Sequence, residues 1–116
     1  MDKTTYKGIK MACNIDVEFS SESKRALDEI SEMKDMANAL SVFIGMSAMV
    51  DIFAGNGVIG SSYKISTTDF ELLTKSMYSS NPILVRQVEN IAGRMYLKSS
   101  LSYEEKQFWR CLYNEL

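Results

Sequence analysis

Histidine is missing from this sequence of 116 residues. A single chain without it cannot build a Ser-His or Cys-His nucleophile pair, and it offers no imidazole ligand to a metal. Residues 55–60 are rich in glycine but lack the Lys-Ser/Thr of a phosphate-binding loop, so they predict a turn. No pair of acids stands in a recognisable pocket-forming pattern. We therefore expect no enzymatic activity, no cofactor and no metal site.

Cysteine is scarce, since Cys13 and Cys111 are the only two and lie far apart without CxxC spacing. This spacing excludes a zinc ribbon and a redox dithiol motif, and we expect two reduced thiols. No basic segment followed by an apolar one opens the chain, so no secretory signal is predicted. Both observations favour a cytoplasmic protein.

Low-complexity runs are also absent, and 46% hydrophobic with 24% charged residues is typical of an ordered domain. The length predicts one domain over residues 1–116. A net charge of −2 argues against coating nucleic acid through bulk positive charge. The charge is uneven, because residues 16–35 hold seven acids against three cations, whereas residues 82–98 hold three cations against one acid.

Apolar and polar residues alternate over residues 9–19, which predicts a half-buried strand. Such a strand needs a partner. Within the chain the candidate is residues 58–65, and the alternative is the same strand of a second subunit.

A helix is predicted to begin near Glu22, after the N-cap candidates Ser20 and Ser21. Residues 36–54 are apolar nearly all round, which indicates a buried helix. Polar residues interrupt this stretch, so we expect a core helix and no membrane contact. Apolar residues recur every three or four positions from the first of these segments into the second, which predicts one continuous helix. These residues are Ala26, Ile30, Met33, Ala37, Leu40 and Ile44.

Residues 68–95 predict two helices joined by a short turn. Thr68 and Glu71 have the spacing of a capping box, and Asn81-Pro82 is a strong start signal for the second helix. The outer face of that second helix is rich in cations and amides, which suits either a DNA major groove or a solvated surface. This face carries Ile83, Arg86, Gln87, Asn90, Arg94 and Lys98.

Residues 65–95 resemble the helix-turn-helix of iron-sulfur-regulator-type winged-helix transcription repressors. The matching residues are Thr67, Thr68, Leu72, Ser80, Asn81, Pro82, Val85 and Arg86. The resemblance implies DNA contacts at Ser80, Asn81 and the start of the second helix. The family's glycine-rich wing and its cluster-binding cysteines have no counterpart in this sequence.

These patterns lead us to expect a mainly α fold, with about four helices and an N-terminal β-strand. The favoured function is a small DNA-binding transcriptional regulator whose partner is double-stranded DNA. Its expected base contacts come from Arg86, Gln87 and Asn90, and its phosphate contacts from Ser80, Asn81, Arg94 and Lys98.

The last predicted helix begins with a second capping box, Ser102 to Glu105. Its stripe of large side chains either docks on the chain's own core or covers the same helix of a second subunit. We expect this helix to dock on the chain's own core and also to contribute to a homodimer interface. The interface residues would be Phe108, Trp109, Leu112 and Tyr113.

The alternative function is a non-enzymatic inhibitor or adaptor that binds another protein. It would use the acidic face of residues 22–35 or a methionine-rich helical face. The methionines concerned are Met33, Met36, Met46 and Met49.

Overall fold

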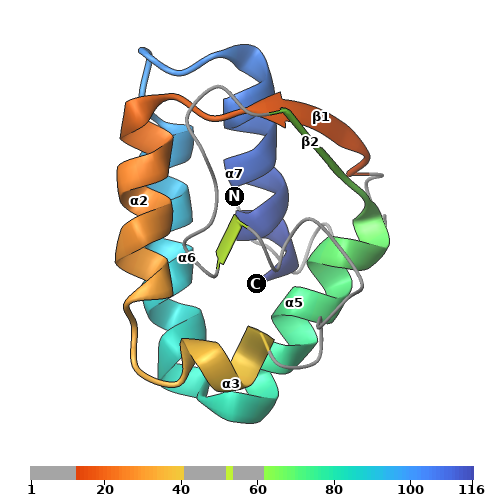
Figure 1. Cartoon of the computed structure of the whole chain (residues 1–116), viewed down its shortest axis with the longest axis vertical. Coiled ribbons are helices and arrows are strands. Elements are labelled where there is room, and N and C mark those ends of the chain that lie inside the picture. The colour runs from red at the N-terminus through yellow and green to blue at the C-terminus, as the bar shows by residue number, and fades with distance from the viewer. Residues whose placement is uncertain (1–12, 41–51, 54–61) are drawn as a thin grey trace.

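The computed structural model describes residues 13–40, 52–53 and 62–116. Across these residues the chain forms five helices and a two-stranded antiparallel sheet (Figure 1). The prediction of a mainly helical fold with an N-terminal strand is confirmed. In chain order the elements are β1 (Ile15–Glu18), α2 (Ser21–Ser31), α3 (Met36–Leu40), β2 (Ser62–Ile65), α5 (Thr67–Ser80), α6 (Pro82–Tyr96) and α7 (Tyr103–Glu115).

The strand predicted over residues 9–19 is seen at Ile15–Glu18, while residues 9–12 lie outside the described part. Its partner is in the same chain, because β1 pairs with β2 and Val17 stands opposite Tyr63. The alternation follows the prediction, since Val17 is buried and its neighbours Asp16 and Glu18 are exposed. A second subunit is therefore not needed to pair β1 with a strand.

The prediction of one continuous helix from Glu22 onward is wrong. Helix α2 ends at Ser31, and α3 begins only at Met36. In the turn between them Asp35, directly before the first residue of α3, adopts a φ of 70°, in the left-handed region. The side-chain amide of Asn81, 46 positions later in the chain, donates to Asp35 Oδ2 at 3.1 Å and holds this turn. Residues 41–51 and 54 of the predicted helix, including Met46 and Met49, lie outside the described residues.

Helix α5 begins one residue earlier than predicted and has a different cap. Ser66, not Thr68, is the N-cap, and its reciprocal partner is Asp69 rather than Glu71. The three other predicted helix starts are confirmed, the first of them at α2, which begins at Ser21 with Ser20 as its N-cap. Asn81 caps α6 by accepting from the Ile83 amide at 3.0 Å, and Ser102 with Glu105 forms the capping box of α7.

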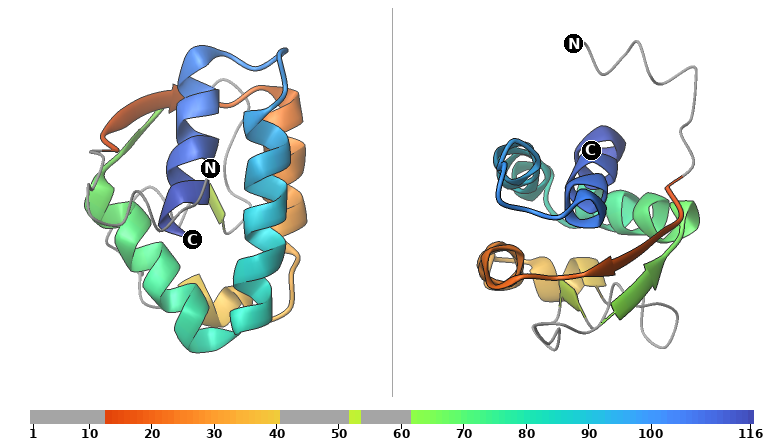
Figure 2. Two further views of the ribbon diagram at one scale, coloured as in Figure 1. Left: turned by 180° about the vertical axis from the view of Figure 1, so that it is seen from behind. Right: turned by 90° about the horizontal axis from the view of Figure 1, so that it is seen from above.

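The elements pack in two layers around one cluster of buried side chains. Helices α5, α6 and α7 lie in one layer, with α2, α3 and the sheet beneath them (Figure 2). Phe108 of α7 lies near the centre, with its ring centroid 5.0 Å from those of both Phe19 and Trp109. Ile52 and Phe53 are fully buried in the same cluster. Among the described helices, none has the length and hydrophobicity that crossing a bilayer requires.

Candidate functional site

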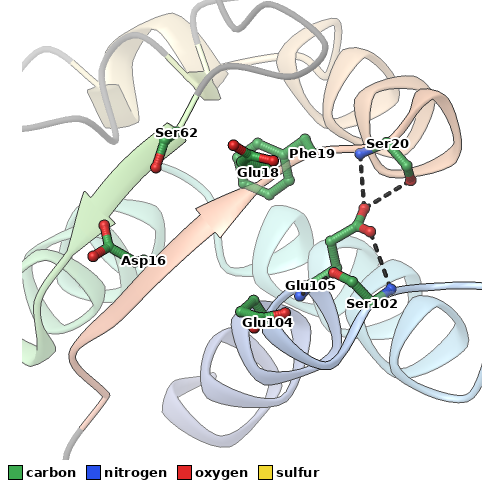
Figure 3. Close-up of a pocket in the computed structure, with 8 residues that line it drawn as sticks. All are labelled: Asp16, Glu18, Phe19, Ser20, Ser62, Ser102, Glu104 and Glu105. Atoms are coloured by element: carbon green, nitrogen blue, oxygen red, sulfur yellow. Dashed lines mark hydrogen bonds between the residues drawn. The ribbon is translucent and has the colours of Figure 1, made fainter.

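An open groove lies where β1, β2 and the N-terminal end of α7 meet (Figure 3). Its volume is about 590 Å³, and none of its eight described lining residues is cationic. Four of them are carboxylates and three are serines. The lining consists of Asp16, Glu18, Phe19, Ser20, Ser62, Ser102, Glu104 and Glu105.

The sheet determines how the acids on β1 face this groove. Because side chains alternate along a strand, burial of Val17 turns Asp16 and Glu18 to the outer surface. Glu18 stands opposite Ser62 of β2 in the strand register. Glu104, in the first turn of α7, is exposed on the other wall. The groove thus carries three exposed carboxylates that come from two separate elements.

Glu105 is the one buried carboxylate of the groove, with 3% of its surface exposed. Its Oε2 accepts hydrogen bonds from the Ser20 amide at 2.9 Å, from Ser20 Oγ at 2.7 Å and from Ser23 Oγ at 2.6 Å. Its Oε1 accepts from the Ser102 amide at 3.1 Å. The Trp109 indole donates to Ser23 Oγ at 3.2 Å and extends this network into the core. Glu105 therefore joins the N-terminal ends of α2 and α7.

These donors control the ionisation of Glu105. Burial by itself raises the pKa of a carboxyl group, but the hydrogen bonds from Ser23, Ser20 and Ser102 outweigh it. The pKa of Glu105 consequently lies below its ordinary value. The group stays ionised near neutral pH, which suits a structural carboxylate and does not suit a proton donor in catalysis.

The DNA-binding residues predicted on α6 divide into two groups. Arg86 and Gln87 are exposed in its N-terminal half and Asn90 just past its middle, as a DNA-reading face requires. Arg94 instead lies 3.4 Å from Glu29 of α2, and Lys98, just beyond the helix, lies 3.1 Å from Glu22. Arg94 and Lys98, two of the four predicted phosphate contacts, are thus already paired with acids of the same chain.

The pairing also neutralises much of the predicted acidic face of residues 22–35. Hydrogen bonds from Ser100 and Lys98 lower the pKa of Glu22, and Lys24 forms an ion pair with Asp28. Glu22 and Glu29 of α2 are therefore matched in charge by Lys98 and Arg94, at and just beyond the C-terminal end of α6. The same ion pairs therefore involve residues of both predicted binding faces: Glu22 and Glu29 of the acidic face, and Arg94 and Lys98 of the DNA-binding face.

The turn of the predicted helix-turn-helix is a single residue. Asn81 ends α5, caps α6 and donates to Asp35, and it is half-buried, as is Ser80. Helix-turn-helix units more often have a turn of three or four residues. The chain after α6 continues through residues 97–102 into α7, so this region of the described chain has no wing strands.

The aromatic stripe of α7 is not available as the predicted dimer interface. Phe108, Trp109 and Leu112 are fully buried in the chain's own core, and Tyr113 is half-buried. Of the two alternatives, docking on the core is the one observed. The reason is that α6, α5, β1 and residues 52–53 already surround this face of α7.

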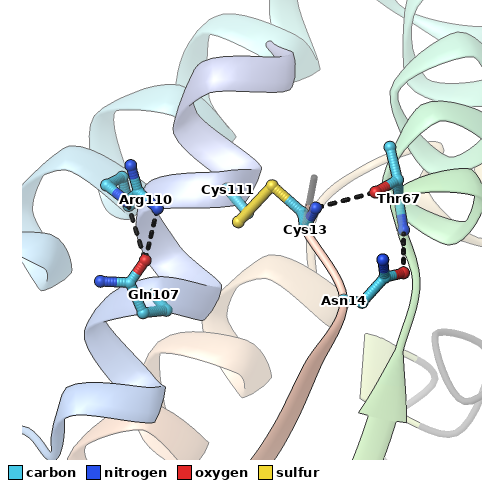
Figure 4. Close-up of a disulfide and its surroundings, with 6 residues drawn as sticks. All are labelled: Cys13, Asn14, Thr67, Gln107, Arg110 and Cys111. Carbon is cyan, nitrogen blue, oxygen red and sulfur yellow. Dashed lines mark hydrogen bonds between the residues drawn. A yellow bond between two sulfur atoms is a disulfide. The ribbon is translucent and has the colours of Figure 1, made fainter. Parts of the chain in front are cut away.

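The prediction of two reduced thiols is wrong. Cys13 and Cys111 form a disulfide that joins the residues just before β1 to α7 (Figure 4). Their Cα atoms are 6.0 Å apart, within the usual range for a disulfide. The lack of a CxxC motif excluded local pairing but said nothing of two cysteines separated by 98 positions.

Sequence reasoning missed the groove because its residues are widely separated in the chain. A partial signal was present, because the alternation over residues 9–19 puts Asp16 and Glu18 among the polar residues of the predicted strand, and Glu105 was expected in a capping box. Among the described residues, no group of three or more Cys, Asp or Glu side chains could hold a metal ion. Comparison with protein-family models, with curated proteins and with solved structures found no match to this chain.

Proposed function

We propose that this chain is a non-enzymatic protein-binding module, an inhibitor or adaptor, that receives a cationic segment of its partner in the acidic groove. One observation carries the proposal: the described residues that line the groove include four carboxylates and no cation. Asp16, Glu18 and Glu104 are exposed there, whereas Glu29 of α2 is paired with Arg94 and Glu22 with Lys98. Lysine or arginine side chains of a partner would supply the missing positive charge.

The chemistry of the groove sets what a partner must provide. Exposed ion pairs are individually weak, so affinity has to come from several of them together with the serine hydroxyls and the concave shape. The bound segment would be short and basic. Glu105 contributes to the walls and not to binding, because its oxygens already accept four hydrogen bonds.

The test is titration of the oxidised full-length protein with a fluorescent arginine- and lysine-rich peptide over a series of salt concentrations. We expect affinity to fall as salt rises, and Glu18→Gln or Glu104→Gln to weaken binding by about two- to fivefold each. Glu32→Gln is the matched control, because Glu32 is exposed at the C-cap of α2 outside the groove and the charge change is the same. Equal effects from all three variants would show attraction by net charge alone and would refute a site in the groove.

DNA binding through α6 is the second candidate, favoured by the exposure of Arg86, Gln87 and Asn90 on one helix. If it operates, Arg86→Ala should cost about 1–3 kcal/mol and relax sequence preference. Lys98→Ala should instead weaken all sequences alike. Glu22→Gln should strengthen DNA binding, because it frees Lys98 from its ion pair. A gel shift at low salt that shows no complex would remove this candidate.

A homodimer also stays a prediction, although both of its original reasons have changed. The strand is paired within the chain and the large residues of the α7 stripe are buried, so an interface would need another surface. Light scattering at a protein concentration of tens of micromolar distinguishes the mass of a monomer from that of a dimer. The cytoplasmic location was predicted from reduced thiols and from the lack of a predicted secretory signal; the disulfide removes the first reason and favours an oxidising compartment.

A further inference from the structure

We propose that the Cys13–Cys111 disulfide is a redox latch that holds β1 on α7 and thereby keeps the acidic groove assembled. The latch is a property of the fold, and its link to partner binding rests on the function proposed above. The support for the latch is the position of the disulfide relative to the other contacts between β1 and α7.

The residues around β1 are attached to α7 at both ends. At the end that leads into α2, Ser20 donates two hydrogen bonds to Glu105 near the start of α7. At the other end, Cys13 is bonded to Cys111 near the C-terminal end of α7. The intervening segment buries Val17 and Phe19 in the core. The disulfide is thus the covalent member of a two-point attachment.

The hydrogen bonds at the Cys13 end lead away from α7. The Cys13 amide donates to Thr67 Oγ1 at 2.8 Å, and the Thr67 amide donates to Asn14 Oδ1 at 3.3 Å (Figure 4). Thr67 is the first residue of α5. Breaking the disulfide would therefore leave this end of β1 tied to α5 and β2 but released from α7.

The groove depends on this attachment because its walls come from the two elements concerned. Asp16 and Glu18 belong to β1, whereas Glu104 belongs to α7 (Figure 3). A shift of β1 relative to α7 would change the separation between the walls and so the arrangement of the carboxylates. The distances between the carboxylates would then no longer match those between the cations of the bound segment.

Opening the latch is a thiol–disulfide exchange with a dithiol reductant. One thiolate of the reductant attacks a sulfur of the bond, which releases the other cysteine as a thiolate and forms a mixed disulfide. The second thiol of the reductant then resolves it, leaving two protein thiols and an oxidised reductant. Cys13 and Cys111 are only 4% and 1% exposed, so exchange must wait for local opening and will be slow.

The test compares amide hydrogen exchange in the oxidised protein, the protein reduced with a dithiol, and the double variant Cys13→Ser/Cys111→Ser. We expect exchange of the β1 amides to accelerate by about tenfold or more in the last two samples, while α6 keeps its protection. The reductant should have no effect on the double variant, which controls for actions away from the bond. The basic peptide should bind the oxidised protein more tightly than either of the others.

Three results would overturn the latch. Two free thiols in the air-oxidised protein after denaturation would show that the bond does not form. Equal β1 exchange in all samples would show that the bond does not restrain the strand. Faster amide exchange in α6 as well would show that the bond stabilises the whole fold and does not act on β1 in particular. If β1 responds but no peptide binds the oxidised protein, the latch stands and the proposed function fails.

Discussion

Ser20 and Glu105, 85 positions apart in sequence, are joined by two hydrogen bonds to one carboxylate oxygen. Ser20 is the N-cap of α2, and Glu105 is the acidic member of the capping box of α7. One carboxylate therefore serves the starts of two helices at once. Its charge is buried but satisfied, which makes removal of that charge costly.

Glu105→Gln should lower the free energy of unfolding by about 2–4 kcal/mol, because an amide has one accepting oxygen and no charge, so at least one of the four donors loses its acceptor and meets an N–H instead. Chemical denaturation at neutral pH measures the change. Glu104→Gln is the matched control, since Glu104 is the preceding residue and is exposed. Similar losses in the two variants would contradict the role assigned to Glu105.

Stability should fall in acid through the same group. The pKa of Glu105 is lowered from an ordinary value of 4.5 in the folded protein, so the ionised group stabilises the fold at higher pH. That contribution is complete above the unfolded-state pKa and is lost as pH falls through the lower folded-state pKa. Denaturation across this range should show a weaker pH dependence in Glu105→Gln than in the unmodified protein. Parallel curves would assign the acid sensitivity to other carboxyl groups.

Asn81→Ala should cost about 1–2 kcal/mol, because it removes the cap of α6 and the hydrogen bond that holds Asp35 in its left-handed conformation. Thermal or chemical denaturation checks this value. Ser79→Ala is the control, since Ser79 is exposed two residues earlier at the end of α5. The comparison also matters for DNA binding, because loss of stability must be separated from loss of a phosphate contact at Asn81.

Gly93→Ala should reveal the close packing of α6 against α7. Alanine in a helix interior is favoured over glycine by about 1 kcal/mol, but a Cβ at this position would lie 3.3 Å from Cε1 of Tyr113. We therefore expect the stabilisation to be roughly 0.5–1 kcal/mol larger in a Tyr113→Ala background. A double-mutant cycle measures the difference. Strict additivity would show that the Tyr113 ring moves aside without cost.

The sequence by itself determined the features that depend on neighbouring residues. Asn81-Pro82 starts α6 and Ser102 starts α7 because capping joins groups within about three residues of each other. The alternation around Val17 likewise predicted which face of β1 is buried. The start of α5 was ambiguous, since Ser66 and Thr68 each have an acid three residues later and both fit a capping box.

Only the tertiary structure decided the features that join distant parts of the chain. The apolar spacing continues through residues 33–40, yet α2 ends at Ser31 and the chain turns before α3, where Asp35 accepts a hydrogen bond from Asn81, 46 positions away. The disulfide and the Ser20–Glu105 contact span still larger separations. Hydrophobic periodicity reports which face of an element is buried but not what covers it. The acidic groove therefore follows from packing, because its carboxylates become neighbours only when β1 lies across α7.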